Sequence, residues 1–264
     1  MTYEGVLTKM QTEYKIPIQY YLIFESSFIN MNQLLNKDIE ITFVGYQCLN
    51  CGKKKKIFRQ GFCYDCFYSS PAVGDWIMKP ELSKAHLGIQ DRDLAYEEKV
   101  QLQPHIVYLA VSGEIKVGVT RKTQVPTRWI DQGATEAIAI VEVPNRYLAG
   151  ITEIALKNHF ADKTNWRKML QNNSDHADLI QERMKLEELI PAEVREYFYI
   201  QKNDLYVMEY PVLQYPKKIN SLNLENTTNF NGKLLGIKGQ YLIFEDGTVF
   251  NVRSYEGYVV RIDV

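Results

Sequence analysis

Long hydrophobic runs are missing from this sequence, and neither charge is in excess. No stretch reaches the roughly 18 consecutive apolar residues that suggest a membrane span, and no basic segment followed by an apolar one resembles a secretory signal. We therefore expect no membrane association and a cytoplasmic localisation. Lys and Arg number 31 against 32 Asp and Glu, and this formal net charge of -1 argues against a uniformly basic nucleic-acid binder. Any nucleic-acid binding must come from local patches.

Cysteine is also scarce, and all of it falls in one short stretch. The four cysteines form two CxxC pairs, Cys48 with Cys51 and Cys63 with Cys66, and Gly52 suits a tight knuckle after the first pair. Four thiolates at this spacing are a tetrahedral zinc set. The alternative of two redox pairs lacks a strand-helix context, and disulfides are disfavoured in the cytosol. The pattern predicts a structural zinc (Zn²⁺) that stabilises a segment too small to fold alone.

A basic segment with aromatic neighbours lies between and after the cysteine pairs. Its basic residues are Lys53, Lys54, Lys55, Lys56 and Arg59, and its aromatic residues are Phe58, Phe62, Tyr64, Phe67 and Tyr68. Such a hairpin can bind phosphates and stack exposed bases, so it is a candidate nucleic-acid contact. The alternative is a solvated loop whose charges only maintain solubility.

The length of 264 residues and the 45% hydrophobic content predict several packed modules of α+β class. The expected modules are an N-terminal β module (1–46), the four-cysteine zinc knuckle (47–70), a connector with some helix (71–104), a central domain (105–200) and a C-terminal β module (201–264). Residues 19–25 and 240–245 share the pattern Gln-Tyr followed by Leu-Ile-Phe-Glu. We infer two related β modules that pack as a pseudo-symmetric pair or join one barrel, the alternative being a chance likeness of strand residues.

The central domain begins with two expected strands. Residues 106–111 form a continuous apolar run, as in a strand that is covered on both faces, and Ser112-Gly113 ends it. Residues 115–119 then alternate, which puts Lys116 and Gly118 on one face. A hairpin of these strands brings Tyr108 near Lys116 if the register allows it.

Two helices and a third strand follow. Residues 123–133 are expected to form a helix ended by Gly133, and residues 138–143 a strand. A second helix begins after Asn145, a suitable N-cap. Glu153 points away from the apolar stripe of this helix, so it faces either water or a site.

These residues resemble a known family. The triplets Ile106-Val107-Tyr108 and Lys116-Val117-Gly118, followed by Arg128 and Glu153, resemble a GIY-YIG endonuclease domain, and the order β-β-α-β-α is similar too. With its zinc knuckle, the chain also resembles a family of prokaryotic proteins of unknown function. The first resemblance implies a divalent-metal-dependent endonuclease acting on DNA or RNA.

The resemblance implies a role for each residue of the motif. Tyr108 positions or deprotonates the attacking water, Arg128 stabilises charge on the phosphate, and Glu153 binds one divalent ion, Mg²⁺ or Mn²⁺. Lys116 stands where the family has a second Tyr, and a lysine there can hold a phosphate or a water. Arg121 and Arg167 are expected to contact the nucleic-acid backbone.

Phosphodiester cleavage needs an activated water, a cation for the phosphate oxygens and a group near the leaving oxygen, and these four side chains can supply all three. Singly, each has an ordinary alternative: Tyr108 as a core tyrosine, Arg128 as a solvated cation, and Glu153 as a partner of Lys157. Two other functions stay open, a non-catalytic RNA- or DNA-binding platform and an RNA-modifying enzyme. Burial of Tyr108 without a polar neighbour would contradict catalysis.

Overall fold

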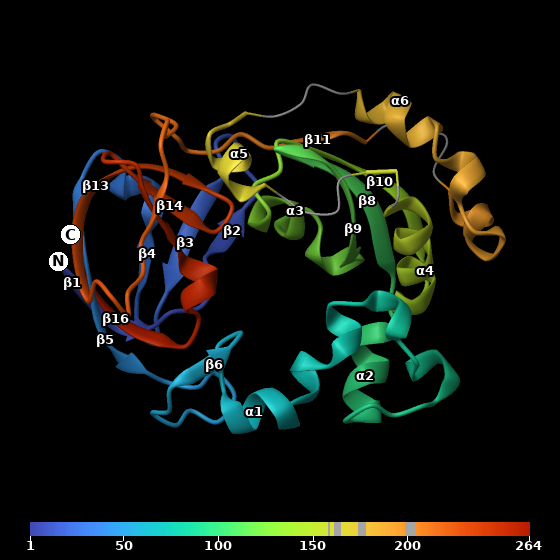
Figure 1. Ribbon diagram of the computed structural model, residues 1–264, viewed down its shortest axis with the longest axis horizontal. Helices are drawn as coiled ribbons and strands as arrows, with labels where there is room; N and C mark the ends of the chain where they lie inside the picture. Colours follow the sequence, from blue (N-terminus) through green and yellow to red (C-terminus); the bar gives the residue numbers. More distant parts are fainter. Residues whose placement is uncertain (158, 161–164, 174–177, 199–203) are drawn as a thin grey trace. The chain divides into compact units, whose positions relative to one another are not determined.

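The computed structural model describes residues 1–157, 159–160, 165–173, 178–198 and 204–264, and it has mixed α+β structure, as predicted (Figure 1). Its contacts divide the chain into two compact units. Unit 1 joins Met1–Ser69 to Met208–Val264, and unit 2 is Ser70–Val207. The expected boundary at 200/201 lies outside the described residues. Among the helices described, none is long and apolar enough to cross a membrane.

Unit 1 is built mainly of strands drawn from both ends of the chain. Within its described residues the largest sheet has seven strands, which in order across it are β1 (Thr2–Val6), β16 (Tyr258–Asp263), β5 (Asp38–Tyr46), β13 (Asn229–Lys238), β14 (Tyr241–Phe244), β15 (Thr248–Asn251) and β12 (Asn220–Ser221). A smaller sheet joins β2 (Gln11–Glu13), β3 (Gln19–Ile23) and β4 (Phe28–Asn30). The N-terminal and C-terminal β modules of the sequence are therefore parts of one unit.

The two similar segments of the sequence have matching local structure. Each forms a strand, a turn and a second strand, followed by a short 3-10 helix that an asparagine caps: η1 (Met31–Leu34) after Asn30, and η9 (Val252–Tyr255) after Asn251. Side-chain oxygens of Asn, which accept from N–H groups that the helix leaves unpaired, are well suited to this position. The likeness of the two sequences is therefore matched by a likeness of structure.

The halves that contain these segments exchange strands. The strand after each short helix, β5 or β16, pairs with a strand of the other half: β16 pairs with β1, and β5 pairs with β13. β5 and β16 also pair with each other, and Ile41 lies opposite Ile262. This exchange explains why residues some 200 positions apart in the chain fold as one unit, since neither half completes its sheet alone.

The cysteine segment forms a small knuckle within unit 1. Its hairpin consists of β6 (Ile57–Arg59) and β7 (Phe62–Cys63), and the short helix α1 (Tyr64–Ser69) follows. Gln60 and Gly61 turn the hairpin with φ values of 53° and 78°. Consecutive positive φ values are typical of the tight turn that matches strand twist, and glycine tolerates them best.

Unit 2 is organised on an antiparallel sheet whose described strands, in order across it, are β11 (Tyr206–Val207), β10 (Glu136–Val143), β8 (His105–Ser112) and β9 (Glu114–Arg121). Its α-helices are α2 (Leu94–Gln101), α3 (Thr127–Asp131), α4 (Arg146–Lys157), α5 (Trp166–Leu170) and α6 (Leu179–Met184). Its 3-10 helices are η2 (Pro71–Val73), η3 (Asp75–Ile77), η4 (Pro80–Leu82), η5 (Ala85–Leu87), η6 (Lys122–Gln124), η7 (Glu187–Leu189) and η8 (Ala192–Tyr197). From β8 to α4 the order is strand, strand, helix, strand, helix.

The two faces of this sheet have different contents. Val107 and Leu109 of β8 pack in a hydrophobic core with Ala149 and Leu156 of α4. Side chains alternate along a strand, so Tyr108 points to the other face, where its ring meets Trp129 of α3. The helix expected over 123–133 is shorter than predicted and is preceded by the single turn η6. Pro126, which lacks an N–H, lies directly before α3.

Residues 71–104, which the sequence suggested as a connector, pack within unit 2. η4 lies against α4 so closely that a Cβ atom on Gly150 would overlap the backbone of Pro80 and Glu81. Only glycine permits this approach, which fixes the segment on the helix that carries Glu153.

Candidate functional site

The hairpin register joins the two triplets of the central domain. Tyr108 of β8 lies opposite Gly118 of β9, and Ala110 lies opposite Lys116. Residues opposite each other share a face, so Tyr108 and Lys116 are diagonal neighbours on one face of the sheet. A Cβ atom on Gly118 would lie 2.6 Å from both Cζ and Oη of Tyr108. The tyrosine ring therefore occupies the space that any side chain at 118 would need.

Tyr108 is fully buried but has polar neighbours. Its exposed fraction is 0%, its hydroxyl donates to Oε1 of Gln132 at 3.0 Å, and its ring centroid lies 5.6 Å from that of Trp129. Burial raises the pKa of Tyr108, against the opposing charge of Arg128. The hydroxyl is thus protonated, and its hydrogen bond orients it. Burial without a polar partner would contradict a catalytic role, but Tyr108 has such a partner in Gln132.

Lys116 is half-buried, and its amine is unusually acidic. Burial, followed by the positive charge of Arg128, lowers the pKa of Lys116 to about 8. An amine with this pKa is partly neutral at slightly alkaline pH. It can accept a proton under conditions in which an ordinary lysine cannot.

Glu153, on α4, is influenced by the charge of Arg128, as Lys116 is. The helix begins as predicted, with Oδ1 of Asn145 accepting from the N–H of Leu148 at 2.9 Å. Burial raises the pKa of Glu153, while the charges of Lys157, Arg146 and Arg128 oppose the rise. Glu153 is thus half-buried, and it lies among several cations and not beside Lys157 alone.

Arg146 connects this region to residues 71–104. Its Nε donates to the carbonyl oxygen of Trp76 at 3.0 Å and its Nη2 to that of Ile77 at 2.7 Å. The guanidinium also lies 5.6 Å from the ring centroid of Trp76. These contacts hold the buried cation in place. Since Arg146 lies close enough to Glu153 for its charge to lower the pKa of that carboxyl, a fixed positive charge is part of the surroundings of Glu153.

His105 lies at the start of β8, opposite Arg121. Burial is the largest of the effects that lower the pKa of His105 to about 4, and the charges of Arg146 and Arg121 add to it. Its Nδ1 lies 2.7 Å from the carbonyl oxygen of Gln103, to which it donates when the ring is neutral. His105 is therefore neutral at physiological pH and structural in character. Arg121, expected to bind nucleic acid, is half-buried beside it.

Arg167, the other cation expected in this domain, lies on α5. Its guanidinium stacks 4.3 Å from the ring centroid of Trp166, and its side chain is exposed. A stacked, exposed guanidinium retains its donors for a phosphate. Its helix, α5, packs against β8, the strand that carries Tyr108.

The four cysteines of the knuckle converge on one point. Their Sγ atoms all lie within 4.8 Å of one another, and those of Cys51 and Cys63 are 4.0 Å apart. Four Zn–S bonds of about 2.3 Å in a tetrahedron require sulfur separations of about 3.8 Å. The cysteines are therefore positioned to hold a metal ion and are compatible with structural zinc, as predicted.

Backbone N–H groups and the Asn50 side chain favour thiolates at this site, although burial and the neighbouring thiols raise the pKa of Cys66. The N–H of Cys63 donates to Sγ of Cys48 at 3.3 Å, and Nδ2 of Asn50 donates to Sγ of Cys66 at 3.4 Å. Burial alone would raise the pKa of Cys48, but backbone N–H groups lower it to about 6. Such N–H···S contacts stabilise the charged form of the ligands, which is the form that binds metal.

The basic hairpin is exposed, but part of its charge is paired within unit 1. Lys55 lies 2.6 Å from Asp65, and Lys56 lies 3.5 Å from Glu225. Exposed pairs of this kind are weak and exchange readily with other anions. Lys53, Lys54 and Arg59 are exposed as well.

An aromatic cluster accompanies these cations. The ring of Phe58 contacts the rings of Tyr64, Phe67 and Tyr68 at centroid distances of 5.2 Å, 5.2 Å and 6.0 Å, and the guanidinium of Arg59 lies 5.4 Å from the same ring. Tyr64 and Tyr68 are 60% and 56% exposed. Exposed rings beside cations provide a surface on which bases can stack.

The surroundings of Glu153 contain no comparable cluster of metal ligands among the described residues. Within the described residues, the cysteines are the only group of three or more close side chains of the kinds that bind metal. Glu153 has Glu81 as a nearby carboxylate, whose charge raises the pKa of Glu153.

Several residues around Tyr108 and Glu153 could not be identified as site residues from the sequence pattern. Gln132 follows a short helix, and Arg146 begins an amphipathic one, so both resemble solvated positions. Trp76 lies in a segment of single helical turns whose packing the sequence does not indicate. Only the fold places them beside Tyr108 and Glu153.

Comparison with known proteins gives one result. No curated protein and no solved structure matches the chain. A family model described as "Protein of unknown function (DUF2797)" matches residues 36–260. The match includes the cysteine knuckle and the whole of unit 2, and it covers most of the chain. The protein therefore belongs to the DUF2797 family.

Proposed function

We propose that this protein binds nucleic acid and that its central domain is a GIY-YIG-like endonuclease that hydrolyses phosphodiester bonds with a divalent metal. One observation carries the proposal: the charge of Arg128 shifts the pKa values of Tyr108, Lys116 and Glu153 alike. The other three side chains named by the resemblance therefore lie within electrostatic range of Arg128. Clustered groups with perturbed pKa values are typical of catalytic sites.

The environments of the four side chains suggest a division of roles. Arg128 stabilises negative charge on the phosphate. Lys116, with its pKa of about 8, accepts the proton of the attacking water, while the pKa of Tyr108 is raised by burial, so that residue stays protonated and orients its neighbours. The base role that the resemblance gives to the tyrosine thus moves to Lys116, the position at which this chain departs from the family pattern.

Glu153 would hold Mg²⁺ or Mn²⁺. These ions bind through one or two carboxylates together with phosphate oxygens and water, so Glu153 with Glu81 nearby is a sufficient donor set. When bound, the ion supplies positive charge to the phosphate oxygens. Arg146, fixed by two backbone carbonyls, maintains the charge balance around Glu153.

The knuckle would serve binding rather than cleavage. Four thiolates favour zinc over the harder ions, and a closed tetrahedral site leaves no position for a substrate. Zinc would hold the hairpin of Lys53 to Arg59 in shape, so that its cations contact phosphates and the rings of Phe58 and Tyr64 stack on bases.

A second candidate is a non-catalytic nucleic-acid-binding platform. The observation that favours it is the complete burial of Tyr108, whose raised pKa makes it a poor base. In this case Lys116, Arg128 and Arg167 would bind phosphates without cleaving them.

A cleavage assay distinguishes the two. The wild-type protein and two variants, Glu153→Gln and Glu193→Gln, are incubated with a pool of DNA and RNA structures in Mg²⁺ or Mn²⁺. Glu193 is an exposed glutamate of the same unit, so its variant controls for loss of one carboxylate. We expect cleavage by the wild-type and Glu193→Gln proteins, and a loss of at least 100-fold for Glu153→Gln, with binding retained.

Other outcomes are equally informative. Binding without cleavage by all three proteins, with an affinity that falls steeply as salt increases, would favour the platform. Equal cleavage by Glu153→Gln and the wild-type protein would exclude the proposed role of Glu153.

A further inference from the structure

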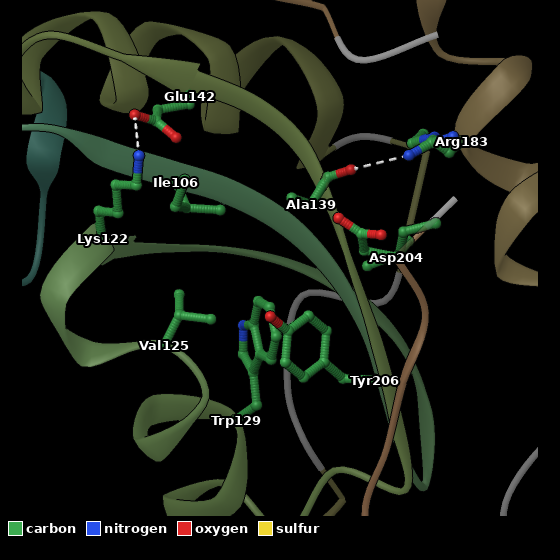
Figure 2. A pocket seen from close by; sticks show the side chains of 10 residues that line it. Ile106, Lys122, Val125, Trp129, Ala139, Glu142, Arg183, Asp204 and Tyr206 are labelled. Atoms are coloured by element: carbon green, nitrogen blue, oxygen red, sulfur yellow. Dashed lines mark hydrogen bonds and ion pairs between the residues drawn. The ribbon is translucent and has the colours of Figure 1, made fainter. Parts of the chain in front are cut away.

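A cavity of about 330 Å³ lies in unit 2 beside Trp129, among residues to which the proposed cleavage assigns no role. The described residues that line it come from β8, η6, α3, β10, α6 and the segment around β11, and are Ile106, Lys122, Val125, Trp129, Ile138, Ala139, Glu142, Arg183, Asp204 and Tyr206 (Figure 2). Ala139 is the register partner of Tyr108, so the cavity adjoins the candidate site. Its volume suits one small ligand and not an extended one.

Trp129 supplies a buried donor at the wall of this cavity. It is 1% exposed, and its ring lies between those of Tyr108 and Tyr206, at centroid distances of 5.6 Å and 4.9 Å. Its Nε1 is buried and has no hydrogen-bond partner among the described residues. In Figure 2 the indole nitrogen lies on the edge of the ring that is turned toward Val125. Buried indole N–H groups usually have an acceptor, so a ligand acceptor is the missing partner.

The charged side chains of the cavity are balanced. Nζ of Lys122 lies 2.7 Å from Oε1 of Glu142, and the charge of Asp204 acts on Arg183, opposing the lowering of the pKa of Arg183 by burial. Figure 2 shows Lys122 and Glu142 at one side of the cavity and Arg183 and Asp204 at another. Two cations and two carboxylates give no net charge, so neither a phosphate nor a cation is favoured, whereas a neutral ligand with both donors and acceptors is.

We propose that this cavity binds a nucleobase. A base is flat, neutral and edged with donors and acceptors, so it can stack along the wall formed by Trp129 and Tyr206 while its edge meets the indole N–H and the charged side chains of the cavity. The base belongs either to a free nucleoside or to an unpaired position in a strand. The inference stands on the cavity and does not require cleavage at Glu153.

Calorimetric titration of the full-length protein tests this. The probes are adenosine, guanosine, cytidine and uridine, and the variants are Trp129→Phe, which keeps a ring but removes the N–H, and Trp166→Phe, which makes the same change on α5. We expect saturable binding of at least one nucleoside, about tenfold weaker for Trp129→Phe and unchanged for Trp166→Phe. Glu142→Gln should leave the fold intact and change the order of preference among the four bases, because it replaces an acceptor with an amide.

A second arm identifies the source of the base. Single-stranded oligonucleotides are compared with copies that carry one abasic position. If the base comes from a strand, Trp129→Phe weakens binding of the intact oligonucleotide and not of the abasic one; if it comes from a free nucleoside, only nucleoside binding responds. Glu153→Gln should bind nucleosides like the wild-type protein, so a failure of cleavage is distinguishable from a failure here. Equal affinity of Trp129→Phe and the wild-type protein, or no saturable binding of any probe, would overturn the inference.

Discussion

Substitution of Gly118 by alanine tests the contact on which the candidate site is built. The added Cβ would lie 2.6 Å from Cζ and Oη of Tyr108, a separation that real Cβ atoms do not tolerate. The ring cannot move freely, because it is fully buried, contacts Trp129 and donates a hydrogen bond to Gln132. Either the ring or the strand must shift.

The expected cost follows from these contacts. Overpacking a filled core costs about 1–3 kcal/mol. Loss of the hydrogen bond to Gln132 adds about 1 kcal/mol. Gly→Ala in a strand without a clash instead gains about 0.5–1 kcal/mol. We therefore expect Gly118→Ala to lower the free energy of unfolding of unit 2 by about 1–3 kcal/mol, a change opposite in sign to that at an open position.

The assay is hydrogen exchange of peptides from β8 and β9, which measures unit 2 separately from unit 1. Gly45→Ala on β5 of unit 1, followed through exchange of peptides from β5, is the matched control, since nothing lies within 4 Å of a Cβ atom there. In a Tyr108→Ala background the clash is absent, so Gly118→Ala should cost almost nothing, a coupling of about 2 kcal/mol. An equal cost of Gly118→Ala in both backgrounds, or no cost in the wild type, would refute the proposed contact.

Three further predictions concern other parts of the chain. Gly150→Ala should destabilise unit 2, although alanine normally favours a helix, because its Cβ overlaps the backbone at residues 80–81; protease protection of residues 71–104 measures the effect, and increased protection would contradict it. The pKa of Lys116 is about 8 in the folded protein and about 10.5 in the unfolded chain, so between these pH values the unfolded chain binds more protons and the free energy of unfolding rises with pH. Lys116→Met should flatten this rise when the free energy of unfolding is measured by denaturant titration from pH 8 to 10.5. An equal rise in the variant and the wild type would be evidence against the shifted pKa. One zinc per chain should be found by metal analysis, absent from Cys48→Ser and retained, with faster release to a chelator, by Asn50→Ala, which keeps all four thiols; a metal-free wild-type protein would exclude the site.

Local patterns were sufficient for part of this structure. The spacing of two CxxC pairs predicts the metal knuckle because all four ligands lie within a stretch whose turns are set by Gly52 and Gly61. Apolar runs, a cap at Asn145 and a break at Ser112-Gly113 likewise predict the order of strands and helices from β8 to α4. These features depend on neighbours in the chain, so their physical causes are written in the sequence itself.

The tertiary structure decided the rest. Strand exchange between β1, β16, β5 and β13 joins both ends of the chain in one unit, and repeated sequence could suggest relatedness but not which strands pair. The packing of η4 on α4 likewise depends on a surface that residues 71–104 do not reveal.

The same holds for the chemistry of the site. Sequence placed Tyr108, Lys116, Arg128 and Glu153 in a pattern, but it could not say that Tyr108 is fully buried or that the pKa of Lys116 is near 8. Those properties depend on desolvation and on charges brought from distant segments, such as Arg146 beside Glu153. Backbone patterns are local, whereas burial and electrostatics are sums over the whole fold, and this is why the sequence determined the elements while the fold determined their chemistry.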